Sequence, residues 1–345
     1  MNPIFIDLRS DTLTLPTQEM KEFMFRAKVG DDVFGEDPSV NDLHEYAADL
    51  FGMEEALFCS SGTQTNQIAI KIHTQPANEV ICDALSHVYL YEGGGIAFNS
   101  GASVRVINSE RGMFTSQDVI DNINKEDVHF PSSSLVCVEN TMNKGGGACW
   151  DWQDLLNIKE VCSNHNLAFH LDGARLFNAL ISKGQNPKQY GQLFDTISIC
   201  LSKGLGAPVG SLLLGSKSQI HKAKRWRKVM GGGMRQAGFL AAAGLFALQN
   251  NVERLQEDHQ KALLIESTLK NCSWVQKILP VETNIVIFQL KNEYPAEQFL
   301  NYLSKNGVKA VSMGKNMVRF VFHLNQKMED VISLKNILKG MPNHQ

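Results

Sequence analysis

The chain has 345 residues and a formal net charge of −3, with 43% apolar and 20% charged residues. This composition excludes a disordered or collagen-like chain, and the near-neutral charge argues against binding to a nucleic-acid backbone. The longest strongly apolar stretch, residues 239–248, is well short of the ~20 residues that span a membrane. Asp7 and Arg9 interrupt the N-terminus before the apolar core of a signal peptide could form. We therefore expect a cytoplasmic globular protein that binds neither membrane nor nucleic acid.

The seven cysteines are an odd number and include no C-x-x-C pair. Most lie in apolar, strand-like runs, as Cys137 does in residues 135–138. This pattern predicts buried free thiols in a reducing compartment, and neither disulfides nor a zinc site.

Short apolar runs alternate with amphipathic segments through the first two-thirds of the chain. The runs predict strands at residues 56–59, 79–83, 103–107, 135–139, 167–172, 196–201 and 211–214. Helices are predicted between them at residues 63–73, 116–123 and 151–165. This alternation is typical of an α/β fold in which helices cover both faces of a mostly parallel sheet.

The pattern changes after residue 250. One long charged helix is predicted over residues 251–271, followed by a strand at 284–290 and a helix at 295–305. Two more strands, at 308–312 and 317–322, precede a final helix. We expect a large domain of residues 1–250, N-terminal segment included, and a smaller α+β domain of residues 251–345, joined by the long helix.

Three motifs follow predicted strands. Ser61, Gly62 and Thr63 open the helix after the first strand, where free backbone N–H groups and the helix dipole favour an anion, although a simple capped turn explains them equally well. Asp172 ends the strand at 167–172 and either caps the next helix or stays ionised beside a cationic ligand nitrogen. Lys203 follows a buried strand and lies between Ser and Gly residues, which favours a lysine that acts as a Schiff-base nucleophile over an ordinary solvated one.

An anion cradle, an aspartate and a lysine together match pyridoxal 5'-phosphate, which has a phosphate, a pyridine nitrogen and an aldehyde. His87 follows the strand at 79–83, where its imidazole either stacks on the cofactor ring or serves only in packing or capping. Neither a P-loop nor a G-x-G-x-x-G dinucleotide motif is present.

These motifs resemble those of the L-specific, low-specificity threonine aldolases, which depend on pyridoxal phosphate. The resemblance covers almost the whole chain and includes residues 7–12, 29–38, 61–64, 139–141, 172–175, 200–206, 226–228 and 231–236. It implies the large-plus-small architecture of the aspartate-aminotransferase-like (fold type I) enzymes. It also implies a homo-oligomer, a dimer or a dimer of dimers, with active sites at the subunit interface.

The resemblance also implies roles for individual residues. Lys203 would carry the cofactor, Asp172 would bind its pyridine nitrogen, and His87 would stack on its ring. The remaining cofactor-binding residues would be Ser61, Gly62, Thr63, Arg175 and Arg235. Ser10, Arg175 and Arg319 would hold the carboxylate of an amino-acid substrate, although a surface ion pair would also explain a lone arginine in a strand. His129 matches a histidine near the substrate hydroxyl, from the neighbouring side of the site.

The expected reaction is the retro-aldol cleavage of L-threonine or L-allo-threonine to glycine and acetaldehyde. His87 or His129 is the candidate base, directly or through a water. A β-eliminating lyase or an aminotransferase would use the same cradle, aspartate and lysine, and remains the alternative. No catalytic metal is expected, because the ten histidines show no H-x-x-x-H or Cys/His spacing.

Overall fold

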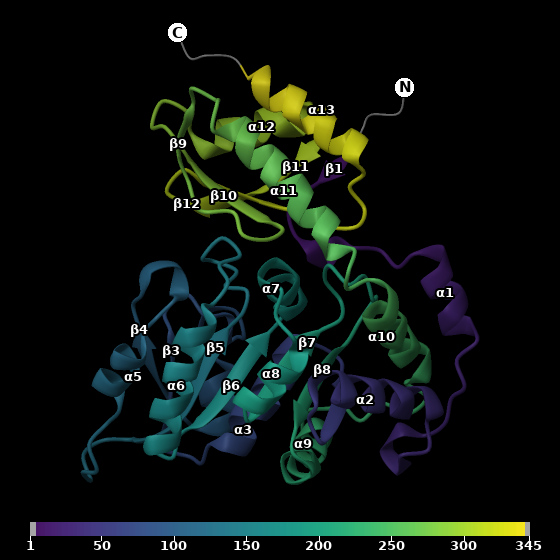
Figure 1. Cartoon of the computed structure of the whole chain (residues 1–345), viewed down its shortest axis with the longest axis vertical. Helices are drawn as coiled ribbons and strands as arrows, with labels where there is room; N and C mark the ends of the chain where they lie inside the picture. The colour runs from purple at the N-terminus through teal and green to yellow at the C-terminus, as the bar shows by residue number, and fades with distance from the viewer. Residues whose placement is uncertain (1–4, 342–345) are drawn as a thin grey trace.

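Seven short apolar runs form the central sheet of the larger of two lobes (Figure 1). The structure, a computed structural model, describes residues 5–341. The strands are β2 (Glu55–Cys59), β3 (Asn78–Asp83), β4 (Ser103–Ile107), β5 (Ser132–Glu139), β6 (Ala168–Gly173), β7 (Thr196–Cys200) and β8 (Ser211–Gly215). Their order across the sheet is β2-β8-β7-β6-β5-β3-β4, and only β8 runs against its neighbours. The predicted mostly parallel sheet is therefore confirmed.

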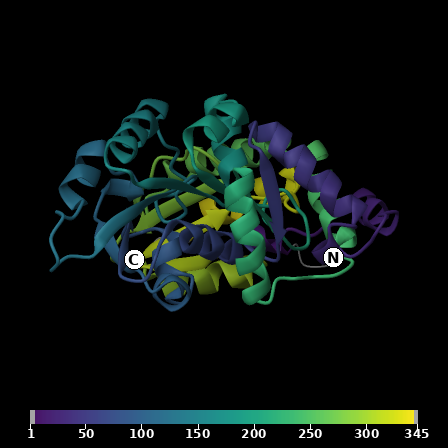
Figure 2. The same cartoon turned by 90° about the horizontal axis from the view of Figure 1, so that it is seen from below.

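Helices cover both faces of this sheet (Figure 2). They are α1 (Gln18–Phe25), α2 (Pro38–Phe51), α3 (Gly62–His73), α4 (His87–Leu90), α5 (Ser116–Asn122), α6 (Trp152–Asn164), α7 (Leu176–Lys183), α8 (Pro187–Leu193), α9 (Lys217–Val229) and α10 (Gly238–Asn250). Helix α3 packs beside α9, and α2 beside α8 and α10. Asp151 caps α6 as expected, whereas α5 is capped by Thr115, one residue before the expected start.

The smaller lobe is an α+β unit, as predicted. It contains α11 (Leu255–Leu269), β9 (Val275–Ile278), β10 (Ile285–Leu290), α12 (Ala296–Lys305), β11 (Val308–Lys309), β12 (Val311–Gly314), β13 (Met317–Val321) and α13 (Met328–Lys339). Strands β12-β13-β10-β9 form an antiparallel sheet. The single strand expected at 308–312 is divided into β11 and β12, and β9 was not expected because its residues are only partly buried.

The N-terminal segment differs from the prediction, which placed it in the large domain. Strand β1 (Ile6–Asp7) pairs in parallel with β11 of the smaller lobe. Ile6 and Leu8 are buried in the hydrophobic cluster of that lobe, together with Phe288 and Phe320. A two-residue strand has too short a pattern to reveal a partner at the other end of the chain.

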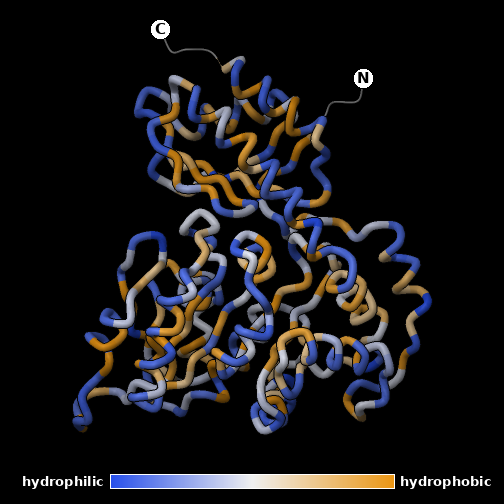
Figure 3. The backbone as a smooth tube through the Cα atoms, viewed as in Figure 1, coloured by the Kyte–Doolittle hydropathy of each residue, from blue (hydrophilic) through white to orange (hydrophobic). Residues whose placement is uncertain are grey.

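The joint between the lobes also differs, because the long helix expected from residue 251 begins only at Leu255, after a turn that follows α10. Apolar segments run through the sheets, and hydrophilic segments lie mainly on the periphery (Figure 3). All seven cysteines are free and six are buried, as expected. Within residues 5–341 no helix is both long and apolar enough to cross a membrane.

Candidate active site

The first turn of α3 forms an anion-binding cradle at the carboxyl end of β2. Ser61 is the N-cap, and its hydroxyl accepts the backbone N–H of Gln64 at 3.2 Å. The N–H groups of Gly62 and Thr63 lie in the first turn, where a helix offers them no partner. A Cβ added to Gly62 would lie 3.6 Å from the hydroxyl of Ser211, which is buried and has no hydrogen-bond partner among the described residues. The turn therefore offers donors for a phosphate.

Asp172 and Lys203 follow neighbouring parallel strands, so they come to the same edge of the sheet. Asp172 lies at the end of β6 and is buried, and Lys203 comes three residues after β7 and is half-buried. Next to Asp172, a Cβ on Gly173 would lie 2.5 Å from the carbonyl oxygen of Ser198 in β7. Only glycine therefore allows β6 and β7 to approach this closely.

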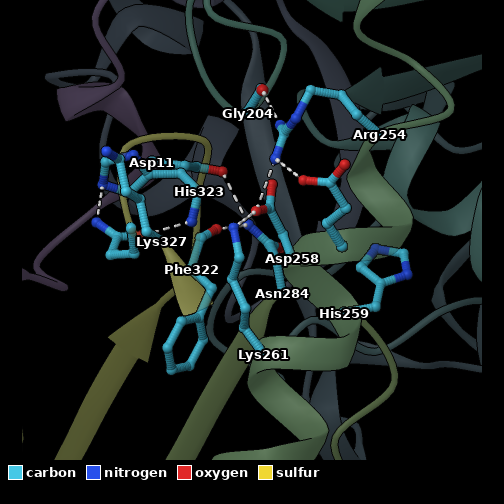
Figure 4. A network of polar contacts seen from close by, with 12 residues as sticks. Asp11, Gly204, Arg254, Asp258, His259, Lys261, Asn284, Phe322, His323 and Lys327 are labelled. Atoms are coloured by element: carbon cyan, nitrogen blue, oxygen red, sulfur yellow. Dashed lines mark hydrogen bonds and ion pairs between the residues drawn. The ribbon is translucent and has the colours of Figure 1, made fainter. Parts of the chain in front are cut away.

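The loop that carries Lys203 is held from both lobes. Its chain turns back through hydrogen bonds from Gly206 N to Lys203 O (2.9 Å) and from Leu201 N to Gly210 O (3.0 Å). The side chain of Asn251 donates to Leu205 O (2.7 Å), and Arg254 of the interlobe turn reaches the carbonyl of Gly204 (3.4 Å; Figure 4). Lys203 Nζ itself forms no hydrogen bond or ion pair with the described residues, so it is available to a ligand.

Asp172 shares an amide with a second buried carboxylate, Glu92. The Asn66 Nδ2 group donates to Asp172 Oδ2 (3.0 Å) and to Glu92 Oε1 (2.9 Å). His87 places Nδ1 3.0 Å from the same Glu92 oxygen. Neither carboxylate has a lysine or arginine partner among residues 5–341. Buried negative charge without such a partner favours a cationic ligand nitrogen at this position.

A third buried carboxylate, Glu139 at the end of β5, links His87 to Asn143, which Arg319 of the smaller lobe contacts. It accepts the backbone N–H of His87 (2.8 Å) and that of Asn143 (2.9 Å). Burial and the nearby charge of Asp172 raise the pKa of Glu139 to about 7. The same carboxylate thus anchors the backbone of both His87 and Asn143.

Arg175 is paired with Asp11, a residue that the sequence analysis did not single out. Arg175 Nε and Nη2 donate to the two oxygens of Asp11 at 2.7 Å each, and both side chains are buried. Burial alone would raise the pKa of Asp11, but the charges of Arg175 and Lys203 lower it to about 2. Asn284 of the smaller lobe adds a longer hydrogen bond to Asp11 (3.3 Å; Figure 4). Arg175 is therefore fixed by one edge of its guanidinium, which leaves Nη1 for a substrate.

Arg319 in β13 reaches the larger lobe from the other side of the site. It donates through Nη1 to Asn143 Oδ1 (2.8 Å) and through Nη2 to the carbonyl of Arg9 (3.0 Å). Its Nε is buried and has no hydrogen-bond partner among the described residues. Burial and the positive charge of Arg175 lower the pKa of Arg319. Ser10, next to Arg9, was predicted to hold the substrate carboxylate. Its hydroxyl accepts hydrogen bonds from the backbone N–H and the hydroxyl of Thr12.

Two of the predicted site residues lie away from this group within one chain. His129 precedes β5, pairs with Asp127 (2.7 Å) and is 82% exposed. The residues from His129 to Glu139 span roughly 25 Å or more at ~3.3 Å per strand residue, so His129 cannot reach the site of its own chain. Arg235 is exposed and pairs with Asp31 (3.0 Å), and it contacts no residue of the cradle.

Sequence analysis missed the polar side chains that support the site: Asp11, Asn66, Glu92, Glu139 and Asn143. Asp11 and Glu139 lie in motifs that were quoted for the family resemblance, but nothing in the spacing revealed their partners. His87, Glu92 and Asp172 also place ligand-type atoms within 4.8 Å of one another. The Asn66 amide N–H groups bind both carboxylates, so hydrogen bonds hold this group together.

The residues present fit pyridoxal phosphate. The α3 cradle with the unpartnered Ser211 hydroxyl suits a phosphate, Asp172, which has no cationic partner among the described residues, suits a pyridinium N–H, and Lys203 Nζ is free for an aldehyde. Arg175 and Arg319 lie on the side of the smaller lobe, where an amino-acid carboxylate would bind.

Comparisons with known proteins identify the family of this chain. The family model described as "Beta-eliminating lyase" matches residues 7–293. A low specificity L-threonine aldolase of Escherichia coli O157:H7 is 41% identical over 94% of this chain and 96% of its own length. A low-specificity L-threonine aldolase of Arabidopsis thaliana is 38% identical over 94% and 93%.

A solved threonine aldolase structure from Leishmania major shares the fold, with a TM-score of 0.85 at 21% identity over 97% of this chain and 98% of its own. The extent of the sequence matches, together with the geometry above, shows that the chain belongs to the beta-eliminating lyase family, among the pyridoxal-phosphate-dependent low-specificity L-threonine aldolases.

Proposed function

We propose that this enzyme cleaves L-threonine, L-allo-threonine and related β-hydroxy-α-amino acids to glycine and the matching aldehyde, acetaldehyde for threonine. The observation that carries the proposal is the arrangement of charges: Arg175 and Arg319 lie above one edge of the sheet, with Lys203 and the unpaired Asp172 at that edge. The relatives of known activity support the substrate class.

The proposed binding of the cofactor uses groups from three strand ends. Lys203 Nζ would be the amine that binds the cofactor aldehyde, Asp172 would keep the pyridine nitrogen protonated, and Ser61, Gly62 and Thr63 would hold the phosphate. When bound, pyridoxal phosphate supplies an electron sink for the electron pair that is released as the Cα–Cβ bond breaks.

The two arginines orient the substrate. Arg175 Nη1 and Arg319 Nε are the donors left for its carboxylate, since the other guanidinium nitrogens are held by Asp11, Asn143 and Arg9. Fixing the carboxylate at one side fixes the rotation about Cα, and with it the direction of the Cα–Cβ bond. Because Arg319 belongs to the smaller lobe, that lobe supplies one of the two donors for the substrate carboxylate.

His87 is the proposed base for the substrate β-hydroxyl, directly or through a water. Its backbone is anchored on Glu139 and its ring on Glu92, and 31% of its side chain is exposed toward the site. Glu92, Asp172 and Glu139 raise the pKa of His87 above its usual value, although burial alone would lower it. A well-placed histidine base contributes ~10²–10⁴-fold to the rate.

We also propose that the active enzyme is a cytoplasmic homo-oligomer, a dimer of dimers. Exposed apolar side chains gather on the N-terminal segment, among them Leu15, Phe25 and Phe34. His129 lies between Val128, which is 98% exposed, and Phe130, also exposed, at the end of the lobe that faces away from its own site. An apolar tip with a histidine at its centre suits a loop that enters the site of another subunit.

The test is to incubate the purified enzyme with L-threonine and L-allo-threonine and to measure acetaldehyde and glycine. We expect both products in equal amounts, and we expect Lys203→Ala to abolish turnover and the visible absorbance of the lysine-bound cofactor. Keto acid plus ammonia would instead show a β-eliminating lyase, and an aminated partner acid would show an aminotransferase.

A further inference from the structure

Glu92 is a buried carboxylate to which none of the steps above assigns a role in the reaction. It follows α4 and its side chain is completely buried. Three side chains surround it with donors: Asn66 Nδ2 at 2.9 Å, Gln67 Nε2 at 2.6 Å and His87 Nδ1 at 3.0 Å. A carboxylate that accepts this many hydrogen bonds is held in its ionised, acceptor-only form.

The orientation of Asn66 indicates that the Glu92 carboxylate only accepts hydrogen bonds. The Asn66 amide nitrogen faces Glu92 and Asp172, and an amide oxygen in its place would meet two further acceptors. The Asn66 oxygen instead faces His170 Nε2 at 3.2 Å. Burial lowers the pKa of His170 to about 4, so its ring is neutral and has one proton to share between Asn66 Oδ1 at Nε2 and the carbonyl of Thr196 at Nδ1 (3.1 Å).

The same accounting decides the tautomer of His87. Because Glu92 only accepts, the ring nitrogen beside it must be Nδ1–H, and the lone pair of the neutral ring is then on Nε2. Nε2 forms no hydrogen bond or ion pair with residues 5–341, and the ring is the partly exposed part of this network. The nitrogen free to accept a proton is thus Nε2, because Nδ1 is held by Glu92.

We propose that Glu92 is a positioning residue that holds His87 in the Nδ1–H tautomer and strengthens Nε2 as the base that takes the β-hydroxyl proton. The inference rests on the proposed retro-aldol function for its catalytic part only, since the tautomer is a property of the protein alone. The other charged or titratable groups near the His87 ring are Asp172 on β6, Glu139 on β5 and Tyr91. The ring centroids of His87 and Tyr91 are 5.6 Å apart, and Lys144 Nζ lies 5.7 Å from the centroid of the Tyr91 ring.

The experiment compares Glu92→Gln, which removes the charge and keeps the shape, with Glu92→Asp, which keeps the charge. The matched control is Glu79→Gln. Glu79 is also a buried carboxylate that accepts several side-chain hydrogen bonds, but its donors are Arg105, Asn124 and Ser103, none of which contacts His87 or Glu92. The first readout is the pH profile of kcat/KM for L-threonine, whose acid limb reports the pKa of the base in the free enzyme.

For Glu92→Gln we expect the acid limb to move to lower pH by about one unit or more, because a negative charge in contact with the ring is lost. The plateau should fall by about tenfold or more, because a less basic nitrogen is a weaker general base. KM should change little, since the arginines bind the carboxylate. Glu92→Asp should keep the acid limb of the wild-type kcat/KM profile. Glu79→Gln should keep both the acid limb and the plateau value of kcat/KM.

The second readout is the nitrogen-15 NMR spectrum of His87 in the cofactor-free protein. The wild type should show protonation at Nδ1 and a bare Nε2, and Glu92→Gln should show a lower titration midpoint or a mixture of tautomers. An Nε2–H tautomer in the wild type, or an unmoved midpoint and acid limb in Glu92→Gln, overturns the proposal. If the wild type does not cleave threonine, the proposed function fails, but the NMR result still decides the role of Glu92.

Discussion

Asp11 is the buried counter-charge of Arg175, and the pair lies where the N-terminal segment meets the large lobe. Replacing Asp11 by Asn would leave the arginine charge buried without its partner. Breaking such a pair typically costs about 3–5 kcal/mol of folding stability. We expect the free energy of unfolding of Asp11→Asn, measured by urea denaturation, to fall by that order, and the KM for threonine to rise because Arg175 loses its fixed edge.

The matched control is Asp7→Asn. Asp7 also pairs with an arginine, Arg9, at 2.6 Å, but the Arg9 side chain is 44% exposed, whereas both side chains of the Asp11 pair are buried. Exposed ion pairs add little to stability because solvent screens them. Equal losses of stability in the two variants would show that burial of the Asp11 pair does not matter.

Strand β5 connects two functional positions at its opposite ends. Glu139 at its carboxyl end anchors His87 and Asn143, and His129 precedes its amino end. If His129 acts in another subunit, oligomers that mix Lys203→Ala chains with His129→Asn chains should recover activity, because some sites then combine an intact lysine with an intact histidine. We expect the mixture to exceed the mean activity of the two separate variants when acetaldehyde release is measured.

The control for this prediction mixes Lys203→Ala chains with Asp172→Asn chains. Both lesions lie at the same edge of the same sheet, so mixing cannot rebuild a site. If the mixture with His129→Asn chains shows no gain over this control, His129 does not complete a neighbouring site.

At the scale of the whole molecule, buried histidines set the response to acid. Burial lowers the pKa of His44 to about 3 and those of His73, His170 and His259 to about 4. The unfolded chain binds protons at these groups below about pH 6.5, while the folded chain does not until about pH 4. The contribution of these neutral histidines to folding stability is therefore fully present above about pH 6.5 and is lost as the pH falls toward 4. Glu139 acts in the opposite direction, since its raised pKa lets the folded state bind a proton first.

We therefore expect the free energy of unfolding to fall between about pH 6.5 and pH 4, by about 1.4 kcal/mol per pH unit for each net proton. Urea denaturation at several pH values gives this slope. His259→Gln, which removes one such group, should reduce the slope, whereas His165→Asn on the surface should leave it unchanged. If the free energy of unfolding stays constant or rises as the pH falls from 6.5 to 4, these histidines are not neutral in the folded protein.

Local sequence patterns predict the α/β fold and the seven strands of the large sheet, and they place Asp172, Lys203 and the first turn of α3 directly after predicted strands. These features depend on local patterns, because apolar runs of strand length and the residues that follow them lie close together in the chain. The position of His87 after a predicted strand also marked it as a candidate, and the family resemblance added Arg175 and Arg319.

Only the tertiary structure decided which residues support these groups. Asp11 meets Arg175 across 164 positions of the chain, Arg9 meets Arg319 across 310, and Asn66 meets Asp172 across 106. The pairing of β1 with β11 is equally remote. A buried polar side chain is stabilised by whichever partner the fold brings to it, and no local pattern specifies a partner this far away. The role of Glu92 could therefore be inferred only once its three donors were in place.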